Sequence, residues 1–598
     1  MPNEQKKILP INYTATEYEG IRKELIQIAE RFYPDTFQDF SEASFGAMMV
    51  DAVAYIGDQL SFYLDYNINE TFLDTAYQYN NVLRHGRIMG YKYAGRPSTF
   101  GKVALFAMVP ASTTGFGPDT GYIPVLNRGS KFSSETGLLF TLIENVDFAD
   151  PKNPVVVARV NTTTGAPTHY AVKAYGNVVS GRFGQQTIVV GAYERFRRVR
   201  LSAANISEVI SVVDTEGNEY FEVNYLSQDI VFKELANTNF KNDNVPSILK
   251  PYLVSRKFVV ERNRHNTYLQ FGSGKSGASN VAADPQAVAM DIFGKDYVTD
   301  TTFDPTQLSK NENFGIVPAS TSLTITYRTT NPNNSNVASY GINAVAGIEL
   351  EFANRQNLVQ SKITEVRNSI EVSNEEPIVG DVSTPSTEEI KRRIFDTFPT
   401  QDRAVTKADY ENVVYRMPAK YGSIKRCSVQ KDPDSLKRNL NMYVISENSS
   451  GKLVKSNSTI KNNLKTWLNH YRMMNDTIDI LDAHILNIGI DFIVRPTTGV
   501  DKFTLLGACV EQLKDKFGQG FYIGEPIYIS DVYNELKKVT GVLDVSSVKL
   551  TNKTTSNYSN VTIDINKNLS PDGSYLVVPK NVIVELKYPA VDVKGKVR

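Results

Sequence analysis

A short glycine-rich segment is the part of the sequence that comes closest to a nucleotide-binding motif. Residues 272–276 read Gly-Ser-Gly-Lys-Ser and follow the strand-like residues 268–271. A phosphate-binding loop needs another glycine five positions before the one that precedes the lysine, so that backbone amides can wrap the phosphates. Leu269 occupies that position, and residues 278–286 show no helical pattern. We therefore predict a flexible loop or hairpin here, with a nucleotide site as the alternative.

Histidines and cysteines form no catalytic or metal-binding pattern. The histidines are His85, His169, His265, His470 and His484. They include no H-E-x-x-H motif and no pair at i, i+4, and the chain has no Gly-x-Ser-x-Gly elbow. A Ser-His-Asp arrangement stays open, because such triads are assembled in space. Cys427 and Cys509 are too few for a disulfide framework or a thiolate zinc site. We expect no enzyme, no catalytic residue, no metal and no cofactor, and a reducing compartment.

The charge balance argues against nucleic acid and membrane partners. Lys plus Arg equals Asp plus Glu at 65 each, so no global basic field is available to hold phosphates. No run of about 20 apolar residues exists to span a bilayer. The first ten residues are polar and lack an apolar signal core, which favours synthesis in the cytoplasm. A net charge of zero favours association, as in an assembly subunit.

The N-terminal part of the chain, residues 14–97, is predicted to be helical. Thr14 and Glu17 have the spacing of a capping box. Apolar residues then recur at helical spacing. Three helices are expected: one that Pro34 ends, one over 44–68 and one over 74–89.

The helix at 44–68 carries the strongest interaction signal. Its apolar stripe is wide and aromatic, and it includes Tyr55 and Tyr63. Such a stripe must be covered either by helices of the same chain or by a partner's helices. Both an internal bundle and a bundle completed by partner helices remain open.

Three carboxylates recur every seven residues on this helix: Asp51, Asp58 and Asp65. Seven residues make about two turns, so these side chains share one stripe. The stripe is expected to be a solvated face. One alternative is a partner helix that bears Lys or Arg, and another is pairing within the chain. The candidates for internal pairing are Arg84, His85 and Arg87.

The full length of 598 residues corresponds to about three to five domains, and the pattern predicts a multidomain α+β fold. An N-terminal helical region is followed by one or two β-rich domains, a mixed connector and two α+β domains. In order, these parts are residues 1–98, 99–330, 331–400, 401–485 and 486–598.

Within residues 401–598, helices are expected to pack on a largely antiparallel sheet. The clearest strand runs from His484 to Val494 with period two, which places His484 in the core. Ser530 is expected to open a late helix, and residues 577–586 are expected to form one strand.

Residues 403–411 read Arg-Ala-Val-Thr-Lys-Ala-Asp-Tyr-Glu and predict a helix start. Thr406 is expected to cap the helix, and the side chain of Asp409 to accept a hydrogen bond from the backbone amide of Thr406. Tyr410 is expected to pack the helix against the rest of its domain. Arg403 is then free to hold a neighbouring carboxylate or carbonyl.

This segment resembles the Arg-x-Val-Thr-x-x-Asp-Tyr-Glu motif of the baseplate J-like family of contractile phage tails. Residues 44–92 are similar to the same family through an Ala-Tyr-x-Gly-Asp core at 54–58, an Asn-Glu-x-Phe-Leu turn at 69–73 and a final Gly-Tyr. The Gly-Glu-Pro at 524–526 and the Gly-Val turn that follows resemble the family's closing helix, and the Phe-Gly hairpin at 271–277 resembles another family turn. The long N-terminal part resembles the larger wedge protein of complex phages.

The resemblance implies a structural protein of the virion tail baseplate that assembles in the host cytoplasm. It would form the inner baseplate ring around the hub and relay the rearrangement that triggers sheath contraction. Implied partners are a second copy in a homodimer, a ring of wedges, other wedge subunits, and the hub and sheath-initiating proteins. A receptor- or glycan-binding tail protein, based on the Tyr-rich β region, is the alternative.

Overall fold

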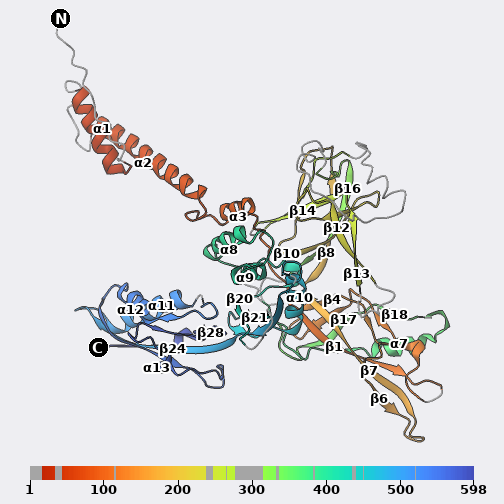
Figure 1. Cartoon of the computed structure of the whole chain (residues 1–598). Coiled ribbons are helices and arrows are strands. Elements are labelled where there is room, and N and C mark those ends of the chain that lie inside the picture. Colours follow the sequence, from red (N-terminus) through yellow and green to blue (C-terminus); the bar gives the residue numbers. More distant parts are fainter. Residues whose placement is uncertain are drawn as a thin grey trace. The chain divides into compact units, whose positions relative to one another are not determined.

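The computed structural model describes residues 16–33, 44–113, 116–236, 247–263, 266–275, 314–330, 336–353, 355–380, 384–433, 439–448, 450–473, 475–518 and 520–598. The chain divides into two compact units (Figure 1). The smaller unit contains Met1–Tyr91 and Pro385–Phe395, and the larger contains Lys92–Thr384 and Asp396–Arg598. The multidomain α+β prediction is confirmed, with N-terminal helices followed by many sheets and later helices.

The smaller unit is helical. Its helices are α1 (Tyr18–Phe32), α2 (Phe45–Thr71), α3 (Tyr79–Ile88) and the first part of α8 (Thr387–Thr400). Ser44 caps α2 by accepting a bond from the amide of Ala47 at 3.0 Å. The predicted capping box of α1 is wrong in its placement, because Glu17 is the N-cap residue and its side chain makes no capping bond. Thr14 and Pro34 lie outside the described residues.

The larger unit begins with a seven-stranded antiparallel sheet. Its strand order is β17 (Ile342–Gly347), β3 (Lys131–Ser134), β4 (Leu139–Leu142), β7 (Pro167–Ser180), β1 (Phe100–Pro110) and β19 (Glu371–Ser373), with β6 (Val155–Val160) paired to β7. Helix α7 (Gln360–Asn368) buries Ile363 and Val366 in the same core. A small sheet joins β18 (Leu350–Glu351), β2 (Val125–Leu126) and β5 (Val146–Asp147). The first sheet therefore takes strands from both the 99–330 and the 331–400 regions.

A second seven-stranded sheet follows, and only its β11–β14 pairing is parallel. The strand order is β8 (Arg182–Val190), β16 (Thr321–Thr329), β10 (Ile206–Val213), β11 (Glu219–Glu222), β14 (Lys257–Arg262), β15 (Thr267–Phe271) and β9 (Arg198–Arg200). Strands β12 (Ile230–Ala236) and β13 (Ser247–Leu253) form a separate pair. The alternation predicted for 323–327 is confirmed, because Leu323, Ile325 and Tyr327 are buried.

The C-terminal part of the larger unit contains two four-stranded sheets with helices. The first holds β20 (Arg426–Lys431), β21 (Asn439–Glu447), β22 (Leu453–Val454) and β23 (Thr477–Asp482), with α9 (Lys407–Tyr415) and α10 (Ser458–Leu468). The second holds β26 (Val542–Asn552), β24 (His484–Pro496), β28 (Val582–Glu585) and β29 (Val593–Val597). Its helices are α11 (Lys502–Phe517), α12 (Ile529–Lys537), α13 (Ile565–Asn568) and α14 (Pro589–Asp592). Strands β25 (Ile527–Tyr528) and β27 (Tyr575–Leu576) pair beside it.

Several details of this C-terminal part differ from the sequence prediction. Both sheets are mixed, because β23 runs parallel to β21, and β28 and β29 run parallel to β24. His484, the first residue of β24, is exposed rather than part of the core. Residues 577–586 do not form one strand, because a turn separates β27 from β28. Tyr528, rather than a serine, is the N-cap residue of α12.

Candidate functional site

Helix α2 is held to α1 through a short stretch of its length. The Arg22 guanidinium on α1 pairs with the Asp51 carboxylate on α2 at 2.5 Å. This hydrogen bond lowers the pKa of Asp51 below its usual value. Near this pair, a Cβ added to Gly57 would lie 3.2 Å from the Ile21 side chain, so a glycine lets the two helices approach closely. Asp51 therefore joins the two helices rather than facing a partner.

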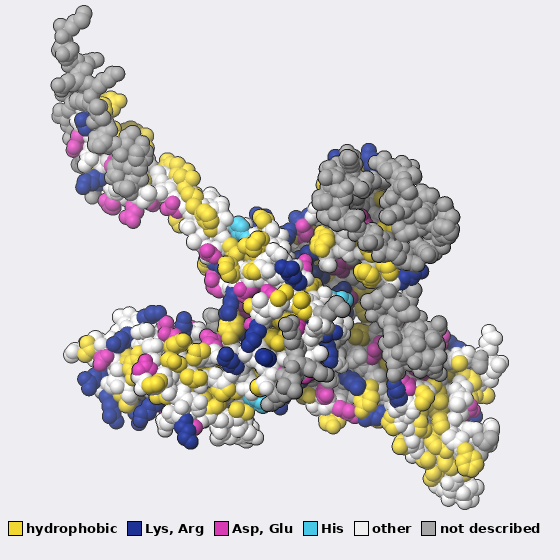
Figure 2. All heavy atoms as spheres, in the orientation of Figure 1, with side chains coloured by type: hydrophobic (Ala, Val, Ile, Leu, Met, Phe, Trp, Pro, Cys, Tyr) yellow, Lys and Arg dark blue, Asp and Glu magenta, His cyan; other side chains and the backbone are white. Residues whose placement is uncertain are grey.

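The rest of α2 presents apolar side chains to solvent. Only Ala47 and Ala54 are buried among its 27 residues. The exposed apolar residues are Phe45, Met48, Met49, Val53, Tyr55, Ile56, Leu60, Phe62, Tyr63, Leu64 and Ile68. Figure 2 shows hydrophobic side chains along this helix. We call this set the α2 apolar surface. A surface of this extent is typical of a helix that binds other helices.

The aromatic residues of the α2 apolar surface contact one another. The rings of Phe62 and Tyr63 lie 5.9 Å apart edge to face, and Phe62 stacks on Tyr66 at 6.2 Å. Tyr55 accepts a hydrogen bond from Gln59 at 2.8 Å. Tyr55 and Tyr63 are both 57% exposed. Their rings therefore lie on the open part of the α2 apolar surface.

Helix α2 contains four carboxylates and neither lysine nor arginine. Within the described part of the chain, Asp58 and Asp65 have no ion-pair partner. The predicted internal pairing with the next helix is wrong for two of its candidates. Arg84 donates to Asn81 at 3.4 Å, and His85 contacts the carbonyl of Glu70 at 2.8 Å. The unpaired carboxylates leave the surface with negative charge beside its apolar residues.

A small groove lies between α1 and α2 and extends the apolar surface. Its volume is about 280 Å³, and its lining residues are Leu25, Ala29, Tyr33, Gly46, Met49, Val50 and Val53. The lining is apolar, so the groove offers a place for one or two apolar side chains of a partner.

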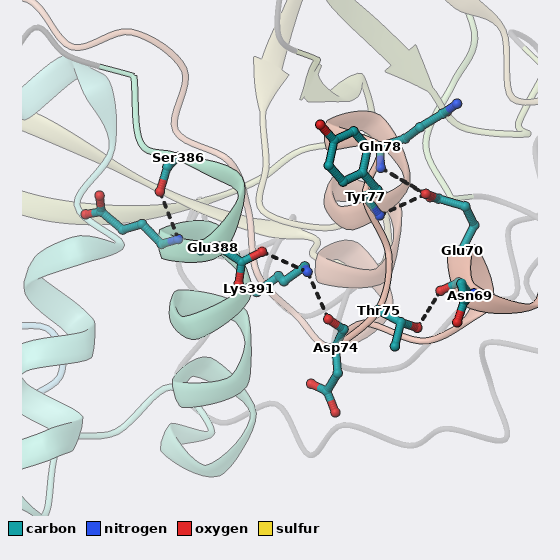
Figure 3. A network of polar contacts seen from close by, with 10 residues as sticks. Asn69, Glu70, Asp74, Thr75, Tyr77, Gln78, Ser386, Glu388 and Lys391 are labelled. Atoms are coloured by element: carbon teal, nitrogen blue, oxygen red, sulfur yellow. Dashed lines mark hydrogen bonds and ion pairs between the residues drawn. The ribbon is translucent and has the colours of Figure 1, made fainter. Parts of the chain in front are cut away.

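Glu70 organises the turn that follows α2 (Figure 3). Its carboxylate accepts bonds from the amide of Tyr77 at 2.8 Å, from the amide of Gln78 at 3.0 Å and from the Asn81 side chain at 2.9 Å. Desolvation raises the pKa of Glu70, but these hydrogen bonds outweigh it and hold the pKa below its usual value. Glu70 explains why α3 starts later than predicted: its carboxylate caps the amides that precede the helix.

The same turn rests on α8 within the smaller unit (Figure 3). Lys391 donates to the carbonyl of Asp74 at 2.9 Å and to Glu388 at 3.0 Å. A Cβ added to Gly86 would lie 2.9 Å from the Ile394 side chain, so α3 and α8 pack closely. Sequence reasoning did not single out Glu70 or Lys391. The Asn-Glu-x-Phe-Leu pattern contained Glu70, but nothing in the sequence linked it to residues 385–395.

The segment 403–411 serves the fold of its own domain. The capping box is confirmed: the amide of Asp409 donates to Thr406 at 3.2 Å, and the amide of Thr406 donates to Asp409 at 2.8 Å. Tyr410 is buried and donates to Asp476 at 2.8 Å. Burial, together with this bond, raises the pKa of Tyr410 to about 12. Arg403 is exposed, and its side chain has no partner among the described residues.

In the glycine-rich segment, the backbone groups of Gly272 and Gly274 form hydrogen bonds with other segments of the chain. The amide of Gly274 donates to the carbonyl of Gly315 at 2.9 Å, and the carbonyl of Gly272 accepts from Phe196 at 2.7 Å. Lys275 lies over the ring of Tyr193, 4.8 Å from its centroid. The residues after 275, including the region where a helix would follow, lie outside the described part.

The described residues offer neither a metal site nor a membrane-spanning helix. They contain no group of three or more His, Cys, Asp or Glu side chains that could hold a metal ion. None of their helices has both the length and the apolar character needed to cross a bilayer.

One family model matches the N-terminal part of the chain. Residues 17–88 match the family model of the bacteriophage baseplate protein N-terminal domain. This match covers α1, α2 and α3, and it supports a structural protein of a phage tail baseplate. No curated protein matches the chain.

Solved baseplate structures are similar to the chain at a low level. The anti-feeding prophage baseplate aligns at 10% identity and a TM-score of 0.24, covering 94% of this chain and 89% of that one. A baseplate subcomplex of the type VI secretion system aligns at 9% identity and a TM-score of 0.24, covering 73% of this chain and 96% of that one.

Proposed function

We propose that this chain is a structural subunit of the baseplate wedge, of the larger baseplate J-like type, and that it is not an enzyme. The observation that carries the proposal is the α2 apolar surface, which lies inside the segment that matches the baseplate N-terminal domain. A helix that is apolar on so much of its circumference is stable in water only when other helices cover it.

The chemistry of this surface defines its partner. Large apolar side chains form most of it, and Asp58 and Asp65 add negative charge without a compensating cation on α2. A matching partner is a helix or helix pair with an apolar stripe flanked by Lys or Arg. Helices of a second copy and of another wedge subunit would together complete such a bundle.

In this proposal, the chain lies in the inner ring around the hub. The wedges close the ring through contacts between neighbouring copies, which gives a symmetric assembly with repeated interfaces. Contacts with the hub and sheath-initiating proteins would let a rearrangement of the ring release sheath contraction.

The proposal is tested by Leu64→Lys in the full chain, expressed in host cells infected with a phage that lacks its own copy of this gene. Leu64 is 63% exposed, so the free protein should keep its melting temperature. Burying a lysine in an apolar bundle should weaken the partner contact by about 2 kcal/mol or more, roughly 30-fold. The measurement is the amount of the chain in purified baseplates.

The matched control is Phe503→Lys on α11, since Phe503 is 85% exposed and lies far along the chain from α2. We expect Leu64→Lys to be depleted from baseplates relative to wild type and to the control. Equal incorporation of Leu64→Lys and wild type would refute a bundle role for α2.

A further inference from the structure

In the larger unit, strand β6 lies at a sheet edge, where it pairs with β7 and is exposed along its length. Strand β7 pairs with β1 along one edge, from His169 to Val179. Along its other edge, residues 178–180 pair with β4 and residues 167–172 pair with β6. All six residues of β6 are exposed. They read Val-Val-Val-Ala-Arg-Val, so both faces of the strand are apolar. Figure 2 shows hydrophobic side chains gathered where Figure 1 places β6 and β7.

The outer edge of β6 has no partner strand among the described residues. The amide of Lys173 donates to the carbonyl of Pro154 at 3.1 Å, which makes this a hydrogen-bonded pair of the ladder. Backbone groups alternate along an antiparallel strand. The amides and carbonyls of Val155 and Val157 therefore point away from β7, toward the open edge.

The charged side chain of β6 has a carboxylate of the same chain within reach. Arg159 is the only charged residue of β6, and it lies 4.0 Å from Glu365 on α7. His169 on β7 contacts the same carboxylate at 3.1 Å. Natural edge strands usually carry charges, above all lysine, that keep other strands away. The stretch from Val155 to Ala158 has no such protection.

We propose that β6 pairs with β6 of a second copy of this chain, antiparallel about a two-fold axis at Val156. This register places Val155 opposite Val157 of the second copy, and the reverse, so the outward backbone groups of both strands form hydrogen-bonded pairs. Val156 then faces Val156 of the second copy. Each β6 gains a neighbouring strand, and the two seven-stranded sheets, one from each copy, become continuous through this pair.

The sequence of β6 favours a second copy over an unrelated strand. In this register every central pair is valine against valine, and cross-strand pairs of β-branched residues stabilise a sheet. Arg159 faces Asn153 of the second copy, so no like charges meet. A two-fold contact needs one patch that is complementary to itself, and this stretch has that property. The inference concerns a surface separate from α2 and does not rest on the proposed function.

The register predicts a specific cross-link in the full-length protein. Val156→Cys would bring two thiols together at a non-hydrogen-bonded pair, where Cα atoms lie about 4.5 Å apart and a disulfide can form. Cys427 and Cys509 are buried, so the native thiols do not compete. The matched control is Val189→Cys, because Val189 is an 82% exposed valine on the edge strand β8.

Under mild oxidation at equal protein concentration, the Val156→Cys dimer should form at least about tenfold faster than the Val189→Cys dimer, because pairing raises the effective thiol concentration. Val156→Lys should shift wild-type dimer to monomer in sedimentation velocity, while Val189→Lys should not. Equal cross-linking rates for the two cysteine variants would overturn the proposal. So would a wild-type dimer that Val156→Lys leaves intact, or cross-links from Val156→Cys to other proteins alone. Leu64→Lys should leave the cross-link unchanged, which separates this test from that of α2.

Discussion

Helices α2 and α11 both carry many apolar residues, but different amounts of these residues are buried in the chain. Helix α11 buries Leu505, Cys509 and Leu513, which recur every four residues and face the sheet that contains β24. Its other side carries lysines and acidic residues. On α2, the apolar residues occupy most of the circumference, and only Ala47 and Ala54 are buried.

The difference shows which helices are stabilised by the chain itself. A narrow apolar stripe can be covered by neighbours in the same domain, as on α11, which packs on β29 and α12. An apolar surface that continues around the helix needs several neighbours, and the described residues of the smaller unit supply α1 for part of it. The stability of α11 is therefore part of the folding free energy, whereas the proposed function makes that of α2 depend on assembly.

The largest expected contrast comes from removing one leucine from each helix. Leu513→Ala should lower the free energy of unfolding of the isolated chain by about 2–5 kcal/mol, because the fully buried side chain leaves a cavity. Leu60→Ala on α2 should change it by less than about 0.5 kcal/mol, because Leu60 is 59% exposed. Urea unfolding of both variants measures the difference. Comparable losses would show that α2 is already covered in the free protein.

The second-largest loss of stability is expected from removing the buried hydroxyl of Tyr410 on α9. Tyr410→Phe removes the donor to Asp476, whose carboxylate is only 8% exposed. We expect a loss of about 1–3 kcal/mol, because the carboxylate is left without that bond. The wild type should also lose stability between about pH 10 and 12, because the raised pKa of Tyr410 favours the folded state only while the phenol is protonated. Tyr340→Phe, at a 68% exposed site, is the control for chemical denaturation.

The N-cap of α9 is expected to matter less. Thr406→Ala removes one acceptor of the capping box and should lower stability by about 0.5–2 kcal/mol. Thr406→Ser keeps the hydroxyl and serves as the control. An unchanged unfolding midpoint in the alanine variant would mean that the cap contributes nothing in solution.

The smallest effect concerns the contact between α1 and α2. Because Arg22 lowers the pKa of Asp51, this contact should be complete above the unfolded pKa of about 4 and lost as pH falls through the lower folded value. Protection of the α1 amides from hydrogen exchange should fall over that acid range. Asp51→Asn should remove the pH dependence, and Asp65→Asn, at an unpaired site, should not. A dependence that persists in Asp51→Asn would place its origin elsewhere.

Local patterns predicted much of the secondary structure. Periodicity located α2, α10, β16 and β24. The Thr-x-x-Asp spacing predicted the α9 capping box, and both of its hydrogen bonds are present. These features depend on residues close together in the sequence, whose geometry is set by caps and side-chain period. The wide apolar stripe of α2 was also visible, since it needs only the helical repeat.

Features that depend on distant contacts escaped prediction. The parallel pairing of β24 with β28 and β29 joins segments about a hundred residues apart, and nothing in either segment specifies direction. Asp51 was grouped with Asp58 and Asp65 by spacing alone, although only Asp51 meets Arg22. The exposed edge of β6 was missed because an apolar run has the same appearance whether a strand is covered or bare.

The lack of lysine and arginine on α2 has a practical consequence for studying the assembly. From Phe32 to Leu83 the chain offers trypsin no cleavage site and amine-reactive cross-linkers no lysine. Tryptic digestion and lysine cross-linking will therefore give no information about α2, the helix that is most expected to bind partners. Chymotrypsin, which cuts after Phe, Tyr and Leu, will find many exposed sites on free α2. Loss of those cuts on mixing with a wedge subunit would map the covered face directly.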